Sequence, residues 1–152
     1  MLWKVHIPDH LSGRKETRDV HVLLLEYFNG ISLFDFAYAH HFTFPTATKQ
    51  KIVSQLLDMV DILHSHGVFH LDLIAGNFLI KDSSAGDLQL RIIDFEFAKL
   101  ATQDTERRLL QRWRYFDRGD LEETLKNMKL MDEEEPLKMD GRYDAISEFL
   151  RR

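Results

Sequence analysis

Three polar side chains interrupt an otherwise apolar segment of this 152-residue chain, "GVFHLDLIAGNFLI" at positions 67–80. They are His70, Asp72 and Asn77, and a further carboxylate, Asp94, follows the segment "RII". A short hairpin after Asn77 would bring Asn77 and Asp94 side by side at its open end. Two carboxylates and an amide oxygen suit Mg²⁺. A carboxylate that does not hold the metal can orient or deprotonate an attacking hydroxyl.

Each of these residues also has a purely structural interpretation. Asp72 could cap the turn after a helix, and Asn77 could satisfy backbone donors in the same loop. Asp94 could be an exposed strand end. For one residue alone the structural interpretation is the better one, but the three positions together favour a site.

The apolar pattern predicts the elements that position these side chains. Residues 46–65 carry apolar side chains at helical spacing, and Gly67 stands where a C-terminal cap is expected. A Ser/Gly-rich turn separates two apolar segments, which predicts a β-hairpin of residues 78–81 with residues 88–93. Asp72 and Asn77 are therefore expected on the loop between the long helix and this hairpin.

The other elements complete an α+β pattern dominated by helix. "LWKVHI" and "VHVLLLEYF" predict an antiparallel pair of strands, joined by the polar loop "DHLSGRKETRD". The second strand is expected to be buried on both faces at its end. Ser32 is expected to cap a short helix that has Asp35 in its first turn. Further helices are predicted in residues 104–116, 119–131 and 140–152.

Composition limits the class of protein. The chain is 44% hydrophobic and 30% charged, which suits one globular domain. No apolar run approaches the roughly 18–20 residues that cross a bilayer, and the first ten residues do not form a signal peptide. Cysteine is absent, which excludes disulfides and thiolate zinc sites. Without a signal peptide or cysteine, we expect a cytoplasmic protein, with a nuclear location as the alternative. A net charge of −5 gives no general reason to expect nucleic-acid binding.

Two motifs resemble those of the protein-kinase-like superfamily. "HLDLIAGN" resembles the catalytic loop H-R-D-L-x-x-x-N, and "IIDFEFA" resembles the D-F-G segment. "LLLEYFNGISLFDF" resembles the strand and hinge between the two kinase lobes. The resemblance covers about Trp3 to Lys99, and it implies a helical C-terminal lobe with a remnant two-stranded N-lobe sheet. It divides a single partial domain, residues 1–152, into N-lobe strands and hinge (1–29) and C-lobe (30–152).

The resemblance implies roles in phosphoryl transfer from ATP with Mg²⁺ as cofactor. Asp72 matches the catalytic base, and His70 matches the histidine that braces this loop. Asn77 and Asp94 match the metal ligands. The acceptor implied is a hydroxyl of a protein or a small molecule.

The resemblance also implies an adenine site. Leu25 matches the gatekeeper residue. The backbone of Glu26 and of Phe28 would face the adenine edge, Leu79 would lie under the ring, and Ile93 directly precedes the metal aspartate.

Several positions depart from the protein-kinase pattern. Leu71 replaces the usual Arg, Ile74 replaces a Lys, and Glu96 replaces the Gly of D-F-G. No A-P-E motif follows. "IDFEFA" is closer to small-molecule kinases that resemble choline and aminoglycoside phosphotransferases, and to fungal kinase-like families. Asp120 could be the buried helix aspartate that holds the catalytic loop in kinases, although a surface cap is the favoured interpretation.

The 152 residues contain no G-x-G-x-x-G loop and no V-A-I-K lysine. These groups stabilise the phosphates in phosphoryl transfer, so we expect weak or no catalysis by this truncated chain alone. One alternative is a pseudokinase or kinase-fold interaction module. It would bind a protein partner, or a second copy, through the uncovered small-lobe face. Another alternative is a fragment of a longer product.

Three further groups of residues have competing interpretations. The triplet His64, His66 and His70 could suggest zinc, but this interpretation is disfavoured. Aromatic residues 113, 115 and 116 are more consistent with helix packing than with stacking on a nucleotide. Five arginines could form a solvated helix face or a docking surface for an anion; they are Arg107, Arg108, Arg112, Arg114 and Arg118.

Overall fold

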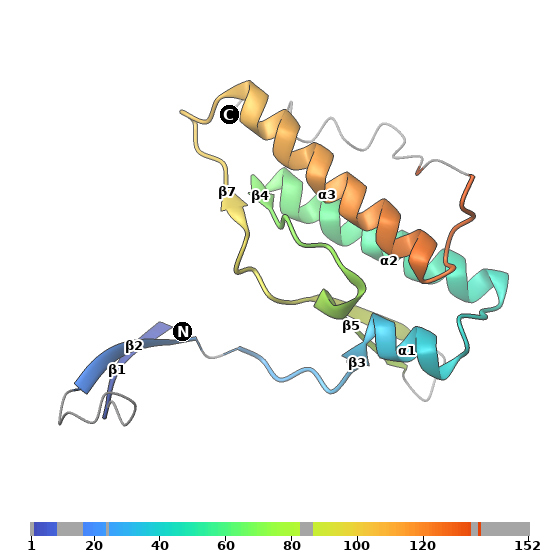
Figure 1. The fold of residues 1–152 in the computed structure, drawn as a ribbon, viewed down its shortest axis with the longest axis horizontal. Coiled ribbons are helices and arrows are strands. Elements are labelled where there is room, and N and C mark those ends of the chain that lie inside the picture. The colour runs from blue at the N-terminus through green and yellow to red at the C-terminus, as the bar shows by residue number, and fades with distance from the viewer. Residues whose placement is uncertain (1, 9–16, 24, 83–86, 135–136, 138–152) are drawn as a thin grey trace.

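The computed structural model describes residues 2–8, 17–23, 25–82, 87–134 and 137. The elements follow one another along the chain as strands, two helices, a hairpin and a long final helix (Figure 1). In order they are β1 Leu2–Pro8, β2 Thr17–Leu23, β3 Ile31–Ser32, α1 Leu33–Ala39, α2 Thr46–Ser65, β4 Val68–Phe69, a 3-10 turn Ala75–Asn77, β5 Phe78–Asp82, β6 Leu88–Ile92, β7 Lys99–Leu100 and α3 Arg107–Asn127. The predicted α+β class is confirmed, and the expected helix in residues 140–152 lies outside the described residues.

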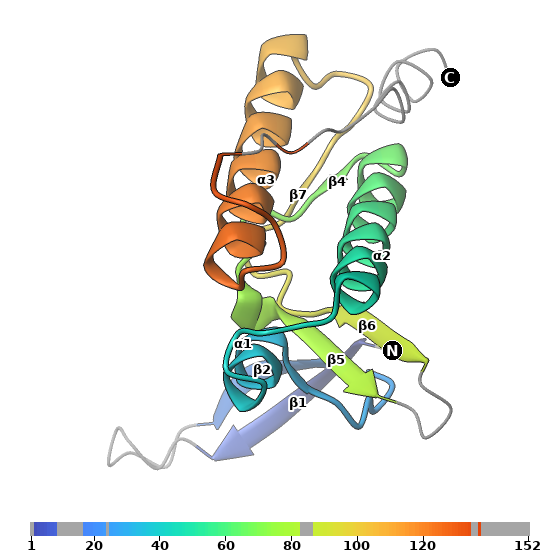
Figure 2. The same cartoon turned by 90° about the vertical axis from the view of Figure 1, so that its right-hand side faces the viewer.

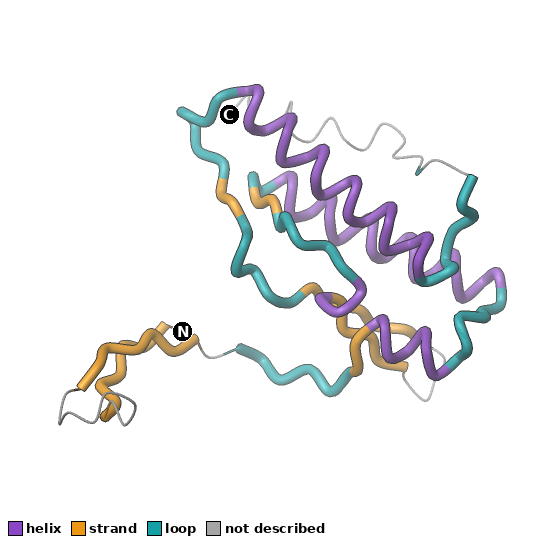
Figure 3. Tube along the Cα trace, viewed as in Figure 1, coloured by secondary structure: helices purple, strands orange, loops and turns teal. Residues whose placement is uncertain are grey.

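Strands β1 and β2 form an antiparallel pair, as predicted, with Leu2 opposite Leu23. This hairpin is a separate two-stranded sheet, and it lies to one side of the helical body in Figure 1. The prediction that the second strand continues to Phe28 is wrong, because residues 25–30 form a loop without regular structure (Figure 3). The expected burial at that end is also wrong, since Leu25 is 70% exposed.

The short helix α1 begins where its cap was predicted. The Oγ atom of Ser32 accepts a hydrogen bond from the backbone N–H of Asp35 at 3.0 Å and donates one to its carboxylate at 2.6 Å. The cap therefore satisfies one of the free N–H groups at the helix start. It also fixes α1 directly after β3.

The long helix α2 has the predicted bounds, Thr46–Ser65. It ends where Gly67 adopts a φ of 71°, a left-handed conformation that glycine enters without steric cost. The two helical segments predicted after Lys99 form one continuous helix, α3, that passes through Gly119. Helices α2 and α3 lie side by side in both views (Figures 1 and 2).

The main apolar core joins the helices to a three-stranded antiparallel sheet of order β3-β5-β6, and a smaller cluster contains Phe69, Ala101 and Leu110. The predicted hairpin is confirmed, with Phe78 opposite Ile92 and alternate residues of both strands buried. The main core residues are Leu33, Phe36, Ile52, Leu56, Val60, Leu73, Phe78, Ile80, Leu90, Leu121 and Leu125. Among the described residues, no helix is long and apolar enough to cross a bilayer.

Candidate phosphoryl-transfer site

In the loop between β4 and β5, the side chain of Asn77 is hydrogen-bonded to Asp72. The Nδ2 atom of Asn77 donates hydrogen bonds to the Asp72 carboxylate at 2.7 Å and to the Asp72 backbone carbonyl at 2.9 Å. Asn77 is 8% exposed and lies at the end of the 3-10 turn, whereas Asp72 is half-buried. Because both amide hydrogens are used, the Oδ1 atom is the part of the Asn77 amide that remains for another ligand.

Asp94 lies at the same end of the hairpin as Asn77. The backbone N–H of Ile93 donates a 2.9 Å hydrogen bond to the Asn77 carbonyl, which extends the β5–β6 pairing to the residue before Asp94. Asp94 is exposed, and its φ of 63° is unusual for a residue with a side chain. Its carboxylate accepts a 3.3 Å hydrogen bond from the backbone N–H of Glu96. The hairpin thus places the backbone of Asn77 next to the residue that precedes Asp94.

His70 connects the loop to the segment that carries Asp94. Its side chain is fully buried, and its Nε2 atom lies 3.0 Å from the Ile93 carbonyl. A carbonyl can only accept, so Nε2 carries the proton in this contact. The imidazole ring also packs on Phe95 with a centroid distance of 4.7 Å. His70 therefore touches the residues on both sides of Asp94.

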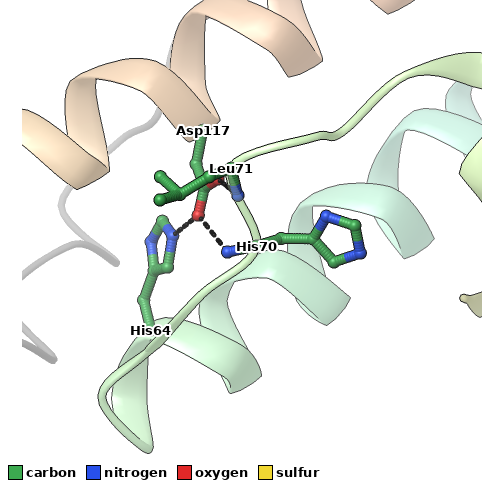
Figure 4. A network of polar contacts seen from close by, with 4 residues as sticks. All are labelled: His64, His70, Leu71 and Asp117. Atoms are coloured by element: carbon green, nitrogen blue, oxygen red, sulfur yellow. Dashed lines mark hydrogen bonds and ion pairs between the residues drawn. The ribbon is translucent and has the colours of Figure 1, made fainter. Parts of the chain in front are cut away.

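A buried carboxylate of α3, Asp117, holds the start of this loop (Figure 4). Its Oδ1 atom accepts the Leu71 N–H at 2.6 Å, and its Oδ2 atom accepts the His70 N–H at 3.0 Å. The Nε2 atom of His64 lies 2.7 Å from the same Oδ2 atom. Leu71 has a φ of 62°, and a left-handed residue at such a point allows consecutive N–H groups to face one anion. The carboxylate therefore fixes the backbone immediately before Asp72.

Sequence reasoning missed Asp117. It considered only Asp120 for this role and favoured a surface cap there, which is wrong because Asp120 lies within α3 and is half-buried. A signal was present in the sequence, since Asp117 continues the buried stripe of α3 that contains Leu110, Leu121 and Thr124. An aspartate in the apolar stripe of a helix needs a polar partner, and here the partner is the loop backbone.

Asp120 contacts the next part of the same loop. The Leu73 N–H hydrogen-bonds to the Asp120 carboxylate, and the Thr124 hydroxyl donates a 2.8 Å hydrogen bond to the Leu73 carbonyl. Burial raises the pKa of Asp120 above 3.8, although the Leu73 hydrogen bond opposes the shift. The negative charges of Asp117, Asp72 and Glu123 raise it further. Residues 117, 120 and 124 share one helix face and together anchor the loop.

The predicted adenine-side residues occupy different surroundings. Leu25 and Glu26 lie exposed in the loop after β2. The Phe28 ring lies 5.3 Å from the guanidinium of Arg91, and Arg91 is the cross-strand partner of Leu79. Arg91 therefore brings Phe28 close to the hairpin.

Ile93 and Leu79 are both half-buried on the hairpin, and Ile93 makes the backbone contact to Asn77 described above. The three histidines and the aromatic residues that were considered as alternative sites do not form one site. The three histidines of the zinc alternative have different surroundings: His64 contacts Asp117, His70 contacts the Ile93 carbonyl, and His66 is exposed. Trp113 packs on Phe69 at 5.6 Å, as expected for a packing residue, whereas Tyr115 is 74% exposed.

Comparison with known proteins agrees with this geometry. The family model described as a protein kinase domain matches residues 10–135. The chain belongs to the protein kinase family. Serine/threonine-protein kinase 17A of Oryctolagus cuniculus is 34% identical over 95 residues, which is 61% of this chain and 23% of that protein.

Two further relatives match a similar part of the chain. Serine/threonine-protein kinase chk-1 of Caenorhabditis briggsae is 33% identical over 98 residues, which is 64% of this chain and 19% of the relative. Death-associated protein kinase 2 of Mus musculus is 32% identical over 83 residues, which is 55% of this chain and 22% of the relative. The chain therefore spans about a fifth of the length of these relatives.

Proposed function

We propose that this chain binds Mg²⁺-ATP and directs its γ-phosphoryl group toward a hydroxyl acceptor held at Asp72. The observation that carries the proposal is the Asn77 side chain, which is hydrogen-bonded to Asp72 while its backbone pairs with Ile93, the residue before Asp94. One asparagine thus connects the proposed base to the proposed metal-binding aspartate. Membership of the protein kinase family supports this assignment.

The residues present fit a magnesium ion. The Asn77 Oδ1 atom and the Asp94 carboxylate are hard oxygen donors, and Asp94 is exposed to an incoming ligand. Mg²⁺ takes few protein ligands and completes its shell with water and substrate phosphates. Such an ion would neutralise charge on the transferred phosphate. The other proposed roles belong to side chains of the protein.

Asp72 is proposed to receive the proton of the acceptor hydroxyl. Its carboxylate is held in one orientation by the hydrogen bond from the Asn77 amide and by the hydrogen bonds of Asp117 to the backbone of residues 70–71. His70 is proposed as a positioning residue, because its contacts with Ile93 and Phe95 fix the segment of Asp94 relative to the loop.

The adenine ring is proposed to lie against the hairpin and the loop after β2. Leu79 and Ile93 would supply the hairpin side, and Leu25 would face the ring from the other side. The backbone of Glu26 and the N–H of Phe28 would contact the adenine edge. We also propose that the boundary between the remnant small lobe and the C-lobe lies near residue 29. A cytoplasmic location of the protein is a further proposal.

We expect the activity of these 152 residues to be low. They contain neither a glycine-rich loop nor the lysine that clamps the phosphates, and such preorganised donors are a large part of phosphoryl-transfer catalysis. Calorimetric titration with ATP and MgCl₂ tests the binding step. We expect weak binding that EDTA abolishes and that Asp94→Asn weakens by about tenfold or more. Asp104→Asn, an exposed change before α3, should leave the affinity unchanged. Binding that survives both EDTA and Asp94→Asn would contradict the metal site.

The role of Asp72 needs a separate measurement. Asp72→Asn should lower any phosphoryl transfer or ATP hydrolysis by about 100-fold or more, which is the usual contribution of a general base. The affinity for Mg²⁺-ATP should change little, because Asp72 is not proposed as a metal ligand. Equal turnover in the two proteins would exclude Asp72 as the base.

A kinase-fold interaction module without catalysis is the second candidate. The observation that favours it is the exposure of large apolar side chains in the loops after β2 and after Asp94, where Leu25 is 70%, Tyr27 is 84% and Phe97 is 57% exposed. Light scattering of the pure chain would detect self-association. Tyr27→Ser should reduce it if this face is the interface, and a monomer at all concentrations would exclude self-association through this face.

A further inference from the structure

Helix α3 has an outer face that lies opposite its buried stripe. The buried stripe includes Asp117 and Leu121, which face the loop and the core. Residues three and four apart on a helix share a face, and the side turned away from this stripe is formed by six exposed residues. They are Arg108, Arg112, Tyr115, Phe116, Gly119 and Glu123. This outer face is therefore turned to solvent rather than to the core.

The N-terminal half of the outer face carries a group of contacting aromatic and cationic side chains. Tyr115 is 74% exposed and Phe116 is 43% exposed, and their rings meet edge to face with a centroid distance of 6.2 Å. The guanidinium of Arg112 lies over the Phe116 ring, 5.5 Å from its centroid. Tyrosine, phenylalanine and arginine are enriched where proteins contact one another. Their exposure as one connected group favours an interaction surface.

The C-terminal half of the same face is hollowed. A hollow of about 580 Å³ is lined by Gly119, Glu122, Glu123, Lys126, Asn127, Lys129 and Glu133. A Cβ atom at Gly119 would meet no atom within 4 Å, so the helix backbone is accessible there. Three carboxylates and two ammonium groups line the hollow, which gives it a net negative charge. One helix face therefore holds a cationic, aromatic protrusion and an acidic hollow beside each other.

These two halves fit each other when a second copy is turned end for end. A two-fold axis perpendicular to α3, near its middle, makes the two copies of the helix antiparallel, and each contact then occurs twice. The register that sets Phe116 opposite Gly119 of the partner subunit also sets Arg112 opposite Glu123 of the partner subunit. A glycine at the crossing allows two helices to approach to about 8 Å, the close end of the usual range. One register thus satisfies both shape and charge.

We propose that α3 forms the interface of a two-fold symmetric dimer of this chain. The Phe116 ring of each subunit enters the hollow above Gly119 of the partner subunit, and Arg112 pairs with Glu123 of the partner subunit. The interface does not include Tyr27, and it does not depend on the proposed phosphoryl transfer. A single pair of helices buries less than the roughly 1,600 Å² of a standard interface, so we expect a dissociation constant in the micromolar range.

Sedimentation velocity of the whole chain over a concentration series tests the dimer. Phe116→Ala should raise the dissociation constant by about tenfold or more, because it removes the aromatic anchor. Gly119→Leu should also raise it by about tenfold or more, because the new side chain fills the hollow that the Phe116 ring enters. The Cβ atom at position 119 has free space within its own chain, and leucine favours a helix, so a thermal melt should show that Gly119→Leu keeps the fold.

Charge reversal tests the register. Arg112→Glu and Glu123→Arg should each weaken the dimer by about fivefold, as expected for exposed ion pairs that occur twice. The double variant should recover most of the affinity, because the pair is formed again with its charges exchanged. The matched control Arg107→Glu reverses an exposed charge in the first turn of α3, away from the outer face, and should leave the dissociation constant unchanged.

Three results would overturn the proposed dimer. The first is a chain that stays monomeric throughout the submillimolar range, which would leave residues 138–152 or a different protein as occupants of this face. The second is a dimer with equal affinity in the parent, Phe116→Ala and Gly119→Leu. The third is a dimer that Tyr27→Ser abolishes and the α3 variants retain, which would place the interface in the loop after β2.

Discussion

The side-chain amide of Asn77 is bonded twice to Asp72, through the carboxylate at 2.7 Å and through the backbone carbonyl at 2.9 Å. This pair closes the loop that precedes β5 and fixes the carboxylate that faces the proposed acceptor. Both hydrogen bonds are donated by the Nδ2 atom of Asn77, so the loop depends on a neutral amide, and not a carboxylate, at position 77. A carboxylate at position 77 would face the Asp72 carboxylate directly.

Asn77→Asp should therefore destabilise the chain by about 1–3 kcal/mol, because two hydrogen bonds are lost and like charges are brought together. Thermal unfolding followed by circular dichroism measures the loss. Millimolar MgCl₂ should recover part of it, since a cation between the carboxylates relieves the repulsion. Asn29→Asp, in the exposed loop after β2, should show neither effect. An unchanged midpoint in Asn77→Asp would contradict the importance of this pair.

Asp117→Ala should destabilise the chain by about 3–5 kcal/mol, because it leaves the buried backbone N–H groups of His70 and Leu71 without their acceptor. It also removes the hydrogen-bond partner of buried His64. Urea unfolding measures the difference. Asp104→Ala changes an exposed aspartate and should stay within about 0.5 kcal/mol of the parent. A loss below 1 kcal/mol for Asp117→Ala would mean that the loop is held mainly by other contacts.

Two glycines should respond to alanine in opposite directions. Gly119 lies inside α3, and a Cβ atom there would meet no atom within 4 Å, so Gly119→Ala should stabilise the chain by about 0.5–1 kcal/mol. At Gly30 the same atom would lie 2.5 Å from the Phe28 ring and 2.8 Å from the Ile80 carbonyl. Gly30→Ala should therefore be destabilising. Chemical unfolding of the two variants tests the contrast, and effects of equal sign would contradict it.

The Glu122–Lys126 pair predicts a specific pH dependence. The hydrogen bond from Lys126 is the main cause that lowers the pKa of the Glu122 carboxyl below its ordinary value of 4.5. A carboxyl whose pKa is lower in the folded state contributes stability above the unfolded pKa, and this contribution is lost as the pH falls through the folded pKa. Glu122→Gln should cost about 0.3–0.5 kcal/mol at neutral pH.

Urea unfolding of parent and Glu122→Gln across the acidic range provides the test. The difference in unfolding free energy should shrink as the pH falls below 4.5 and vanish once the carboxyl is protonated in both states. High salt at neutral pH should reduce the difference as well, because the pair lies at the surface. A difference that stays constant through the acidic range would show that packing, rather than charge, is responsible.

Local sequence determined the elements that rely on short-range contacts. The bounds of α2, the cap of α1 by Ser32 and the pairing of β5 with β6 all follow from periodicity or from hydrogen bonds between near neighbours. The candidate residues Asp72, Asn77 and Asp94 could be proposed for the same reason. Their separation in sequence is spanned by one loop and one hairpin, so local structure is enough to bring them to one end.

Only the tertiary structure decided which carboxylate of α3 holds the loop. Asp117 and Asp120 lie on the same helix face, and sequence cannot tell which of them meets the N–H groups of a segment more than 40 residues away. The way α3 crosses the loop assigns Asp117 to residues 70 and 71, and Asp120 to Leu73. Exposure of Leu25 was likewise a tertiary outcome, because burial depends on what packs against a strand end and not on the apolar character of the residue itself.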